Sequence, residues 1–230
     1  MGPPFVIPAD TSAVLSDTAC VFAADLIRMA LEEDGPDLTS LGIFPPQEQS
    51  SAYIVAKQRT IVVGLPLISL VFSVIGMAPD AWSAEVKEGS LVEKGTVVAR
   101  LHGSTIQLLK AERVILNLMT HLSGVADLTR EYVERLEGTG VRLLDTRKTL
   151  PGHRYLEKYA VRVAGGVNHR MNLADMLMIK DNHIDAAGSI TKAVEALRSR
   201  YQPCPPIEVE CRNADEVREA VACRPERIML

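Results

Sequence analysis

Apolar and polar positions in the second half of the chain follow a pattern that predicts strands separated by helices. Short apolar runs occupy residues 141–144, 176–179, 207–210 and 227–230, and segments with helical periodicity occupy residues 154–163, 189–201 and 213–222. Strands that alternate with helices of this length indicate βαβ units and a parallel sheet. This half of the chain is therefore expected to have an α/β fold.

The first half of the chain mixes helical and strand patterns. Residues 16–34 predict an amphipathic helix, which Ser16 or Asp17 can cap and Gly35 can end. Strands are predicted over residues 51–56, 60–63 and 82–87, a buried helix over 65–76, and a hairpin over 88–103. Residues 106–122 predict a strong helix, which Ser123-Gly124 is expected to interrupt before a second helix that ends near residue 137.

Charged side chains stand where the predicted parallel strands end. Arg147 and Lys148 follow the first apolar run, Lys180 follows the second, and Glu210 ends the third. In parallel α/β barrels, residues that contact ligand lie where strands end and loops begin. This repeated placement predicts the mouth of an active site rather than scattered surface charge.

A further cationic cluster, His169-Arg170, follows the pair Gly165-Gly166. Glycines allow a ligand to approach the backbone closely, so this cluster favours anion binding. Residues 142–180 carry eight Lys and Arg against three Asp and Glu, although the whole chain has a net charge of −4. A local cationic region in an acidic protein suggests a small polyanionic ligand.

Composition and spacing exclude several classes of protein. The net charge of −4 gives no reason to expect nucleic acid or an anionic membrane as a partner. The four cysteines form no CxxC pair and are expected to be free thiols in a reducing cytoplasm. No signal peptide is visible, and the apolar residues 65–76 are too few to cross a bilayer. The five histidines show no HxH or HExxH spacing, and neither a nucleotide-binding glycine motif nor a GxSxG motif occurs.

Ordered motifs over nearly the whole chain resemble those of the quinolinate phosphoribosyltransferase family. They are Glu-Asp-Gly-Pro-Asp-Leu-Thr-Ser (33–40), Glu-Arg-Val-Ile-Leu-Asn (112–117), Leu-Ser-Gly-Val-Ala (122–126), Asp-Thr-Arg-Lys-Thr-Leu-Pro-Gly (145–152), Glu-Lys-Tyr-Ala-Val-Arg (157–162), Gly-Gly-Val-Asn-His-Arg (165–170), Ile-Lys-Asp-Asn-His (179–183) and Glu-Val-Glu (208–210). Each motif is weak alone, but the ordered set is highly specific.

The resemblance implies phosphoribosyl transfer from 5-phosphoribosyl-1-pyrophosphate (PRPP), carried with Mg²⁺, to quinolinate. Nicotinate mononucleotide, pyrophosphate and CO₂ would be the products, in de novo NAD biosynthesis. Guanidinium groups bind carboxylates bidentately, and ammonium groups meet phosphates as point charges. The implied substrate-binding residues are Arg113, Thr146, Arg147, Lys148, His169, Arg170, Lys180 and Glu210, of which Lys148, Lys180 and Glu210 are the implied catalytic residues.

The same resemblance implies an N-terminal α/β sandwich domain, residues 1–110, and a partial parallel α/β barrel, residues 111–230. It also implies a homodimer in which Arg113 reaches the site of the neighbouring subunit. The family continues beyond the position of Leu230 with an aspartate and a glycine-rich phosphate loop, so the barrel is expected to be C-terminally truncated. The 230-residue chain is accordingly expected to bind quinolinate but to turn over poorly alone.

Two alternatives stay open at this point. The first is a pyrophosphorylase-like paralogue of molybdate-uptake operons that acts on another substrate. The intact Lys180-Asp181-Asn182-His183 segment argues against this paralogue. The second is a catalytically inactive, truncated subunit that keeps the dimer surface.

Overall fold

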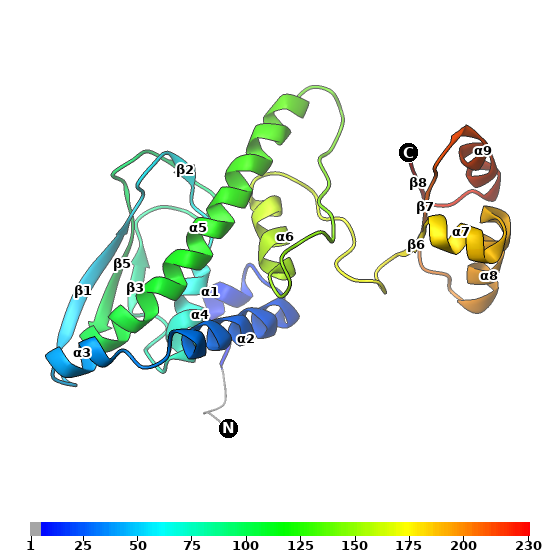
Figure 1. Ribbon diagram of the computed structural model, residues 1–230. Coiled ribbons are helices and arrows are strands. Elements are labelled where there is room, and N and C mark those ends of the chain that lie inside the picture. The colour runs from blue at the N-terminus through cyan, green and yellow to red at the C-terminus, as the bar shows by residue number, and fades with distance from the viewer. Residues whose placement is uncertain (1–5) are drawn as a thin grey trace. The chain divides into compact units, whose positions relative to one another are not determined.

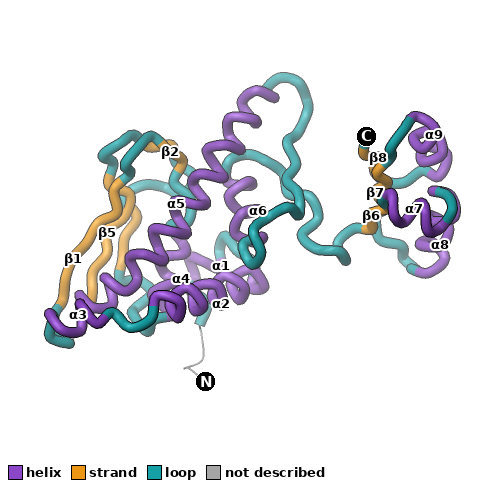
Figure 2. The backbone as a smooth tube through the Cα atoms, in the orientation of Figure 1, coloured by secondary structure: helices purple, strands orange, loops and turns teal. Residues whose placement is uncertain are grey.

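The structure, a computed structural model, describes residues 6–230. Figures 1 and 2 show the elements, which form two compact units. The first unit ends at His169, and the second comprises Arg170–Leu230. The predicted domain boundary at residues 110 and 111 lies within a long helix and stays a prediction. Across residues 6–230, no helix combines the length and apolar character that a membrane crossing requires.

The first unit combines small antiparallel sheets with helices (Figure 2). Its strands are β1 (Gln49–Val55), β2 (Thr60–Ile61), β3 (Trp82–Ala84), β4 (Leu91–Val92) and β5 (Val97–Ser104). Its helices are α1 (Ala9–Ser12), α2 (Asp17–Asp34), α3 (Leu38–Ile43), α4 (Pro66–Val74), α5 (Thr105–Leu136) and α6 (Arg154–Val163). One sheet has the strand order β1-β5-β3, and the other pairs β2 with β4.

The hairpin predicted over residues 88–103 is wrong. The strands β4 and β5 lie within this segment but do not pair with each other. Instead, β4 pairs with β2, and β5 pairs with β1 on one side and β3 on the other. The spacing of the glycines correctly predicted turns in this segment. Which strands pair with each other depends on contacts between strands that are distant in sequence.

The break predicted at Ser123-Gly124 is also wrong, because α5 runs without interruption. Ser123 is buried, and its hydroxyl accepts a hydrogen bond from the Val63 backbone N–H at 3.1 Å. One turn later, Asp127 accepts from the Ile61 N–H and the Thr60 hydroxyl, each at 2.7 Å. These contacts bind α5 to β2, and such tertiary contacts override the weak helix propensity of serine and glycine.

The core of the first unit lies around α4. Residues 66–72 are all buried, and α4 packs against α2 and α5, which confirms the predicted buried helix. The predicted start of α2 is also confirmed, since the Ser16 hydroxyl accepts from the Ala19 N–H at 3.3 Å.

Glu88 links the β-rich part of this unit to α4 and α6. Its carboxylate accepts from the backbone N–H groups of Gly64 and Leu65, at 2.7 and 3.0 Å, and from the Tyr159 hydroxyl at 2.8 Å. Gly64 and Leu65 precede α4, where free N–H groups and the helix dipole favour an anion. Burial raises the pKa of the Glu88 carboxyl, and burial together with the neighbouring Glu88 raises the pKa of Tyr159.

Replacing Tyr159 with phenylalanine is expected to lower the free energy of unfolding by about 1.5–3 kcal/mol, because a half-buried carboxylate loses a donor. Urea denaturation measures this loss. Tyr132→Phe is the matched control, since the Tyr132 side chain is exposed on α5. Equal unfolding midpoints for the two variants would show that the Tyr159 hydrogen bond contributes nothing.

The second unit confirms the predicted α/β pattern. Its strands are β6 (Leu177–Ile179), β7 (Ile207–Glu210) and β8 (Arg227–Met229), and its helices are α7 (Asp181–Ala187), α8 (Ile190–Arg200) and α9 (Ala214–Cys223). The strands are parallel, in the order β6-β7-β8. Within the described residues, these strands form an open sheet and no closed barrel. The short helix α7 was not predicted.

Candidate active site

The segment predicted as the first parallel strand, residues 141–144, forms only a bridge. Leu144 pairs with Val167 in parallel, the Val167 N–H donates to the Leu143 carbonyl at 2.8 Å, and the Asp145 N–H donates to the Val167 carbonyl at 3.1 Å. The strand prediction was therefore wrong, because residues 141–144 form no strand of the β6-β7-β8 sheet. The bridge brings the start of the Asp145–Lys148 segment beside Asn168 and His169.

Asp145 is the centre of a buried polar cluster, the Asp145 cluster, which also contains Lys158, Asn168 and His169. Its carboxylate forms an ion pair with the Lys158 ammonium group. The same carboxylate accepts from the Asn168 side-chain amide at 2.7 Å and from the His169 backbone N–H at 2.8 Å. The Lys158 side chain is only 1% exposed, and it also donates to the His169 carbonyl at 3.0 Å. These bonds fix the backbone just before Arg147 and Lys148, at Asp145, and just before Arg170, at Asn168 and His169.

Thr146, Arg147 and Lys148 form the turn that follows the cluster. The Thr146 hydroxyl accepts from the Lys148 N–H at 3.0 Å, which shapes this turn. Lys148 is exposed, whereas the Arg147 Nε atom is buried and has no hydrogen-bond partner in the part of the chain that the structure describes. A buried guanidinium donor without an acceptor is costly, and a bound carboxylate would supply one.

Gly165 and Gly166 have a role in packing that the sequence did not predict, and close ligand approach at these glycines stays a prediction. Gly165 has a φ of +94°, and Gly166 is buried. A Cβ atom on Gly166 would lie 2.6 Å from Cγ1 and 3.1 Å from the carbonyl oxygen of Val161. The glycines therefore let the chain turn tightly over the end of α6 and enter the bridge at Val167.

The second unit brings Lys180 and Glu210 together. Ile179 on β6 is opposite Val209 on β7, so the next residues leave the sheet side by side. The Lys180 ammonium lies 3.0 Å from a Glu210 carboxylate oxygen, and both side chains are more than 40% exposed, at 46% and 42%. This placement agrees with the predicted position at strand ends, and solvent access leaves both groups available to a ligand.

Arg170 also belongs to the second unit, where it contacts the segment that enters β6. Its guanidinium donates to the Met176 carbonyl at 3.0 Å and lies 3.5 Å from the Met178 sulfur. His183 has a local structural role, because its Nδ1 accepts from the Lys180 backbone N–H at 3.0 Å and caps α7. The motif around Lys180 thus fixes the backbone from which the lysine projects.

Arg113 is placed apart from the other predicted residues of the first unit. It is exposed on α5 and lines a cleft of about 720 Å³ between that helix and β1. Thr146, Arg147, Lys148 and His169 do not line this cleft. The exposed side chains of Tyr53 and Leu109 give the cleft an apolar lining.

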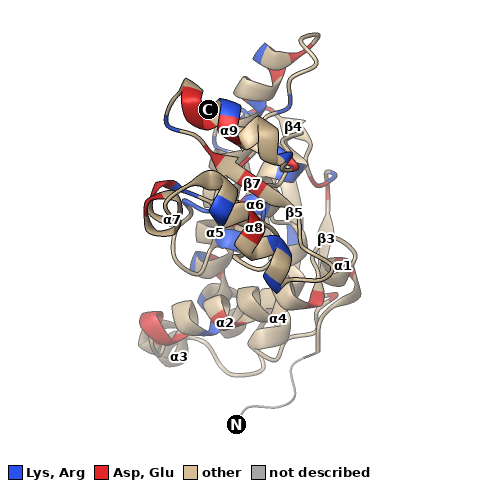
Figure 3. Cartoon of the chain, turned by 90° about the vertical axis from the view of Figure 1, so that its right-hand side faces the viewer, with Lys and Arg blue, Asp and Glu red and all other residues tan. Residues whose placement is uncertain are grey.

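Many other charged residues of the second unit are used in surface ion pairs. Figure 3 marks acidic residues on α7 and α9. Arg212 joins these helices, with ion pairs to Asp185 at 2.9 Å and to Glu216 at 2.6 Å. The Arg212 hydrogen bonds hold the pKa of Glu216 below its ordinary value. Ion pairs at the protein surface add little stability. The Lys180–Glu210 pair differs from these pairs in its place at the ends of two parallel strands.

Sequence reasoning missed the positioning role of Asp145, Lys158 and Asn168. All three lie within the motifs at residues 145–152, 157–162 and 165–170, but the sequence analysis assigned no role to them. A signal was present: Lys158 stands among apolar positions of a helix, where a buried lysine requires a carboxylate partner. The spacing within the chain could not identify that partner.

Comparisons with known proteins agree with this arrangement of motifs. The family model for the N-terminal domain of quinolinate phosphoribosyl transferase matches residues 37–123, and the model for its C-terminal domain matches residues 125–230. A probable nicotinate-nucleotide pyrophosphorylase [carboxylating] from Synechocystis sp. is 46% identical over 184 residues, which cover 80% of this chain and 62% of the relative. The chain thus spans about three fifths of that relative's length.

Two further relatives are similar over most of the chain. The nicotinate-nucleotide pyrophosphorylase [carboxylating] of Mycobacterium leprae is 38% identical over 94% of this chain and 78% of its own length. The crystal structure of NadC from Streptococcus pyogenes matches with a TM-score of 0.82 and 39% identity, over 90% of this chain and 73% of that one. The matched motifs, the fold and these relatives together show that the chain belongs to the quinolinate phosphoribosyltransferase family.

Proposed function

We propose that the protein transfers the phosphoribosyl group of PRPP to quinolinate, with loss of CO₂, to give nicotinate mononucleotide and pyrophosphate. The observation that carries this proposal is the buried, unpartnered Arg147 Nε in a turn that the Asp145 cluster holds in place. A planar dicarboxylate such as quinolinate would satisfy a fixed guanidinium group. Arg170 and His169 supply further donors suited to carboxylates.

The remaining predicted residues suit the second substrate. Lys148 and Lys180 offer ammonium groups to phosphate and pyrophosphate oxygens. Displacement at the anomeric carbon develops positive charge on the ribose, and the Glu210 carboxylate would stabilise that charge. The second role proposed for Glu210 is to accept a hydrogen bond from a ribose hydroxyl. The Lys180 ammonium group, 3.0 Å from a Glu210 oxygen, orients this carboxylate. Positioning of the two anionic substrates would supply much of the rate acceleration.

Mg²⁺ is proposed to arrive with PRPP, bound to the pyrophosphate oxygens. Carboxylate oxygens are suitable Mg²⁺ ligands, and the 42% exposed Glu210 side chain offers one. We place the protein in the cytoplasm. Its four cysteines, Cys20, Cys204, Cys211 and Cys223, are free thiols, which suits a reducing compartment.

The proposal includes a homodimer in which Arg113 serves the site of the partner subunit. Within its own unit, Arg113 lines a cleft that the other predicted residues do not reach. Tyr53 and Leu109, which are 65% and 41% exposed, leave apolar surface on that cleft for a second copy of the chain to cover. A donated arginine would explain why Arg113, which belongs to a family motif, lines a cleft that the residues of the cationic turn do not line.

The activity is tested with the protein, PRPP, Mg²⁺ and either quinolinate or nicotinate. We expect nicotinate mononucleotide and CO₂ from quinolinate, and no nucleotide from nicotinate, because only quinolinate has the second carboxylate. Chromatography of the nucleotide and trapping of labelled CO₂ measure both products. Quinolinate left unchanged under these conditions would contradict the proposed reaction and would favour a paralogue with another substrate.

A further inference from the structure

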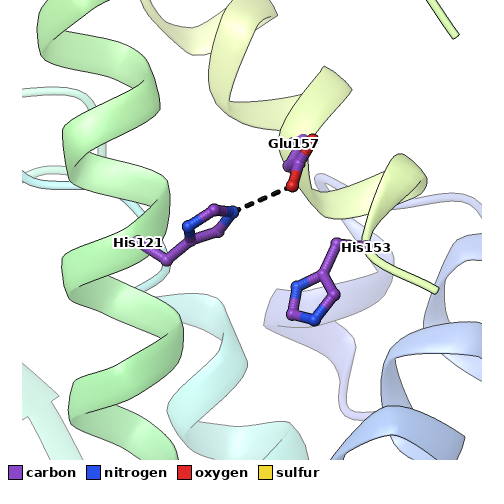
Figure 4. A group of neighbouring side chains, drawn as sticks. All are labelled: His121, His153 and Glu157. Carbon is purple, nitrogen blue, oxygen red and sulfur yellow. Dashed lines mark hydrogen bonds and ion pairs between the residues drawn. The ribbon is translucent and has the colours of Figure 1, made fainter. Parts of the chain in front are cut away.

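Three potential metal ligands meet where α5 packs against α6. His121 comes from α5, Glu157 from the first turn of α6, and His153 immediately precedes α6 (Figure 4). One ring nitrogen of each histidine and one Glu157 carboxylate oxygen all lie within 4.8 Å of one another. His153 and Glu157 are four residues apart, so both face the same side, towards α5.

The group is incompletely satisfied by its own hydrogen bonds. His121 Nε2 lies 3.0 Å from a Glu157 oxygen, and the Leu150 N–H donates to the same oxygen at 3.4 Å. The His153 ring meets His121 edge-on, with 5.5 Å between centroids, and its buried Nδ1 has no hydrogen-bond partner among residues 6–230. Such a buried polar atom calls for a partner.

We propose that His121, His153 and Glu157 bind a Zn²⁺ ion. Two imidazoles and one carboxylate form a known three-ligand zinc set, which leaves the fourth position to water. Bonds of about 2.0–2.2 Å would place the ligand atoms roughly 3.3 Å apart around a tetrahedral ion. The present spacing reaches up to 4.8 Å, so the proposal requires the three side chains to move closer together around the ion.

The three side chains are accessible to a metal ion from solvent. The His121 side chain is 34% exposed and that of Glu157 is 13% exposed, so an ion and its water can reach the group from solvent. The unpartnered Nδ1 of His153 offers a nitrogen that no residue within 6–230 uses. None of the eight proposed substrate-binding residues belongs to this group, so the site is separate from the proposed chemistry.

Calorimetric titration of the metal-free protein with Zn²⁺ tests the proposal. We expect one equivalent to bind, and His153→Leu and Glu157→Gln each to weaken that binding by roughly 10- to 100-fold or more, since even loss of an outer-shell partner has an effect of this size. His102→Gln is the matched control, because His102 is exposed on β5, and its affinity should equal that of the parent protein.

Co²⁺ supplies a second readout, because its visible absorption reports a four-coordinate site. We expect this absorption in the parent and in His102→Gln, and its loss in both ligand variants. Circular dichroism checks that each variant is folded, and either ligand variant alone suffices if the other unfolds. The absence of stoichiometric Zn²⁺ binding, or equal binding by the parent and the folded variants, would overturn the proposal. Equal binding would place the ion on the free thiols or on other histidines.

Discussion

Replacement of Asp145 with alanine is expected to destabilise the protein by about 3–5 kcal/mol, because it leaves a buried charge without its partner. The Lys158 side chain is 1% exposed, and the His169 carbonyl would be its one remaining acceptor among the bonds described above. The Asn168 amide and the His169 N–H would also lose their acceptor. Urea denaturation followed by circular dichroism measures the change in the free energy of unfolding.

The geometry further predicts an asymmetry between the two partners. Lys158→Met should cost less than Asp145→Ala, because the Asp145 carboxylate would keep its bonds from Asn168 and His169. The double variant should lose less stability than the sum of the single losses, by roughly 0.5–3 kcal/mol, the usual coupling of residues in one network. Lys94→Met, at an exposed position, is the control. Additive losses, or an Asp145→Ala loss below that of the control, would contradict the structural role of the cluster.

Under the proposed function, Arg113→Ala and Lys148→Ala are each expected to abolish nearly all of the proposed transferase activity, and mixing the two variants should restore part of it. In a mixed dimer, one site would combine the intact Arg113 of one subunit with the intact Lys148 of the other. If subunits exchange at random in an equal mixture, about a quarter of the parent activity should return, because half the dimers are mixed and each has one intact site.

Mixing Arg147→Ala with Lys148→Ala provides the matched control for this experiment. Both residues lie in the same turn of the same chain, so no mixed dimer contains a site with both intact. Activity should therefore stay low in this mixture after subunit exchange, which tagged subunits can demonstrate. Recovery in the control, or no recovery with Arg113→Ala, would show that Arg113 does not act across the dimer.

Local periodicity predicted several elements in the second half of the chain well. The predicted helix over residues 154–163 is α6 of the first unit, with the same bounds, and the predicted strand over residues 207–210 is β7 of the second unit. The helical spacing of apolar positions predicts α6, and the short run with Ile207 and Val209, both buried, predicts β7. The pairing of Lys180 with Glu210 also follows from sequence, because the carboxyl ends of neighbouring parallel strands lie together.

Features that depend on distant contacts could not be predicted in this way. The pair Ser123-Gly124 predicted a break in the helix. In the structure α5 is continuous, and the Val63 N–H donates a hydrogen bond to the Ser123 hydroxyl. Gly166 was predicted to lie in a flexible loop, but the structure packs it closely against Val161. The pairing of Asp145 with Lys158 was missed for the same reason, because sequence spacing carries no information on which buried charges meet.

Calorimetric titration of quinolinate into the 230-residue chain tests the central proposal, that the turn held by the Asp145 cluster binds a carboxylate. Arg147→Ala should weaken binding by roughly 2–5 kcal/mol, or about 30-fold or more. Arg147→Lys should recover little, because an ammonium group lacks the bidentate fork. Arg142→Ala, which alters an exposed arginine in the same segment, should bind as the parent does. Equal quinolinate affinity in the parent and Arg147→Ala would contradict the account.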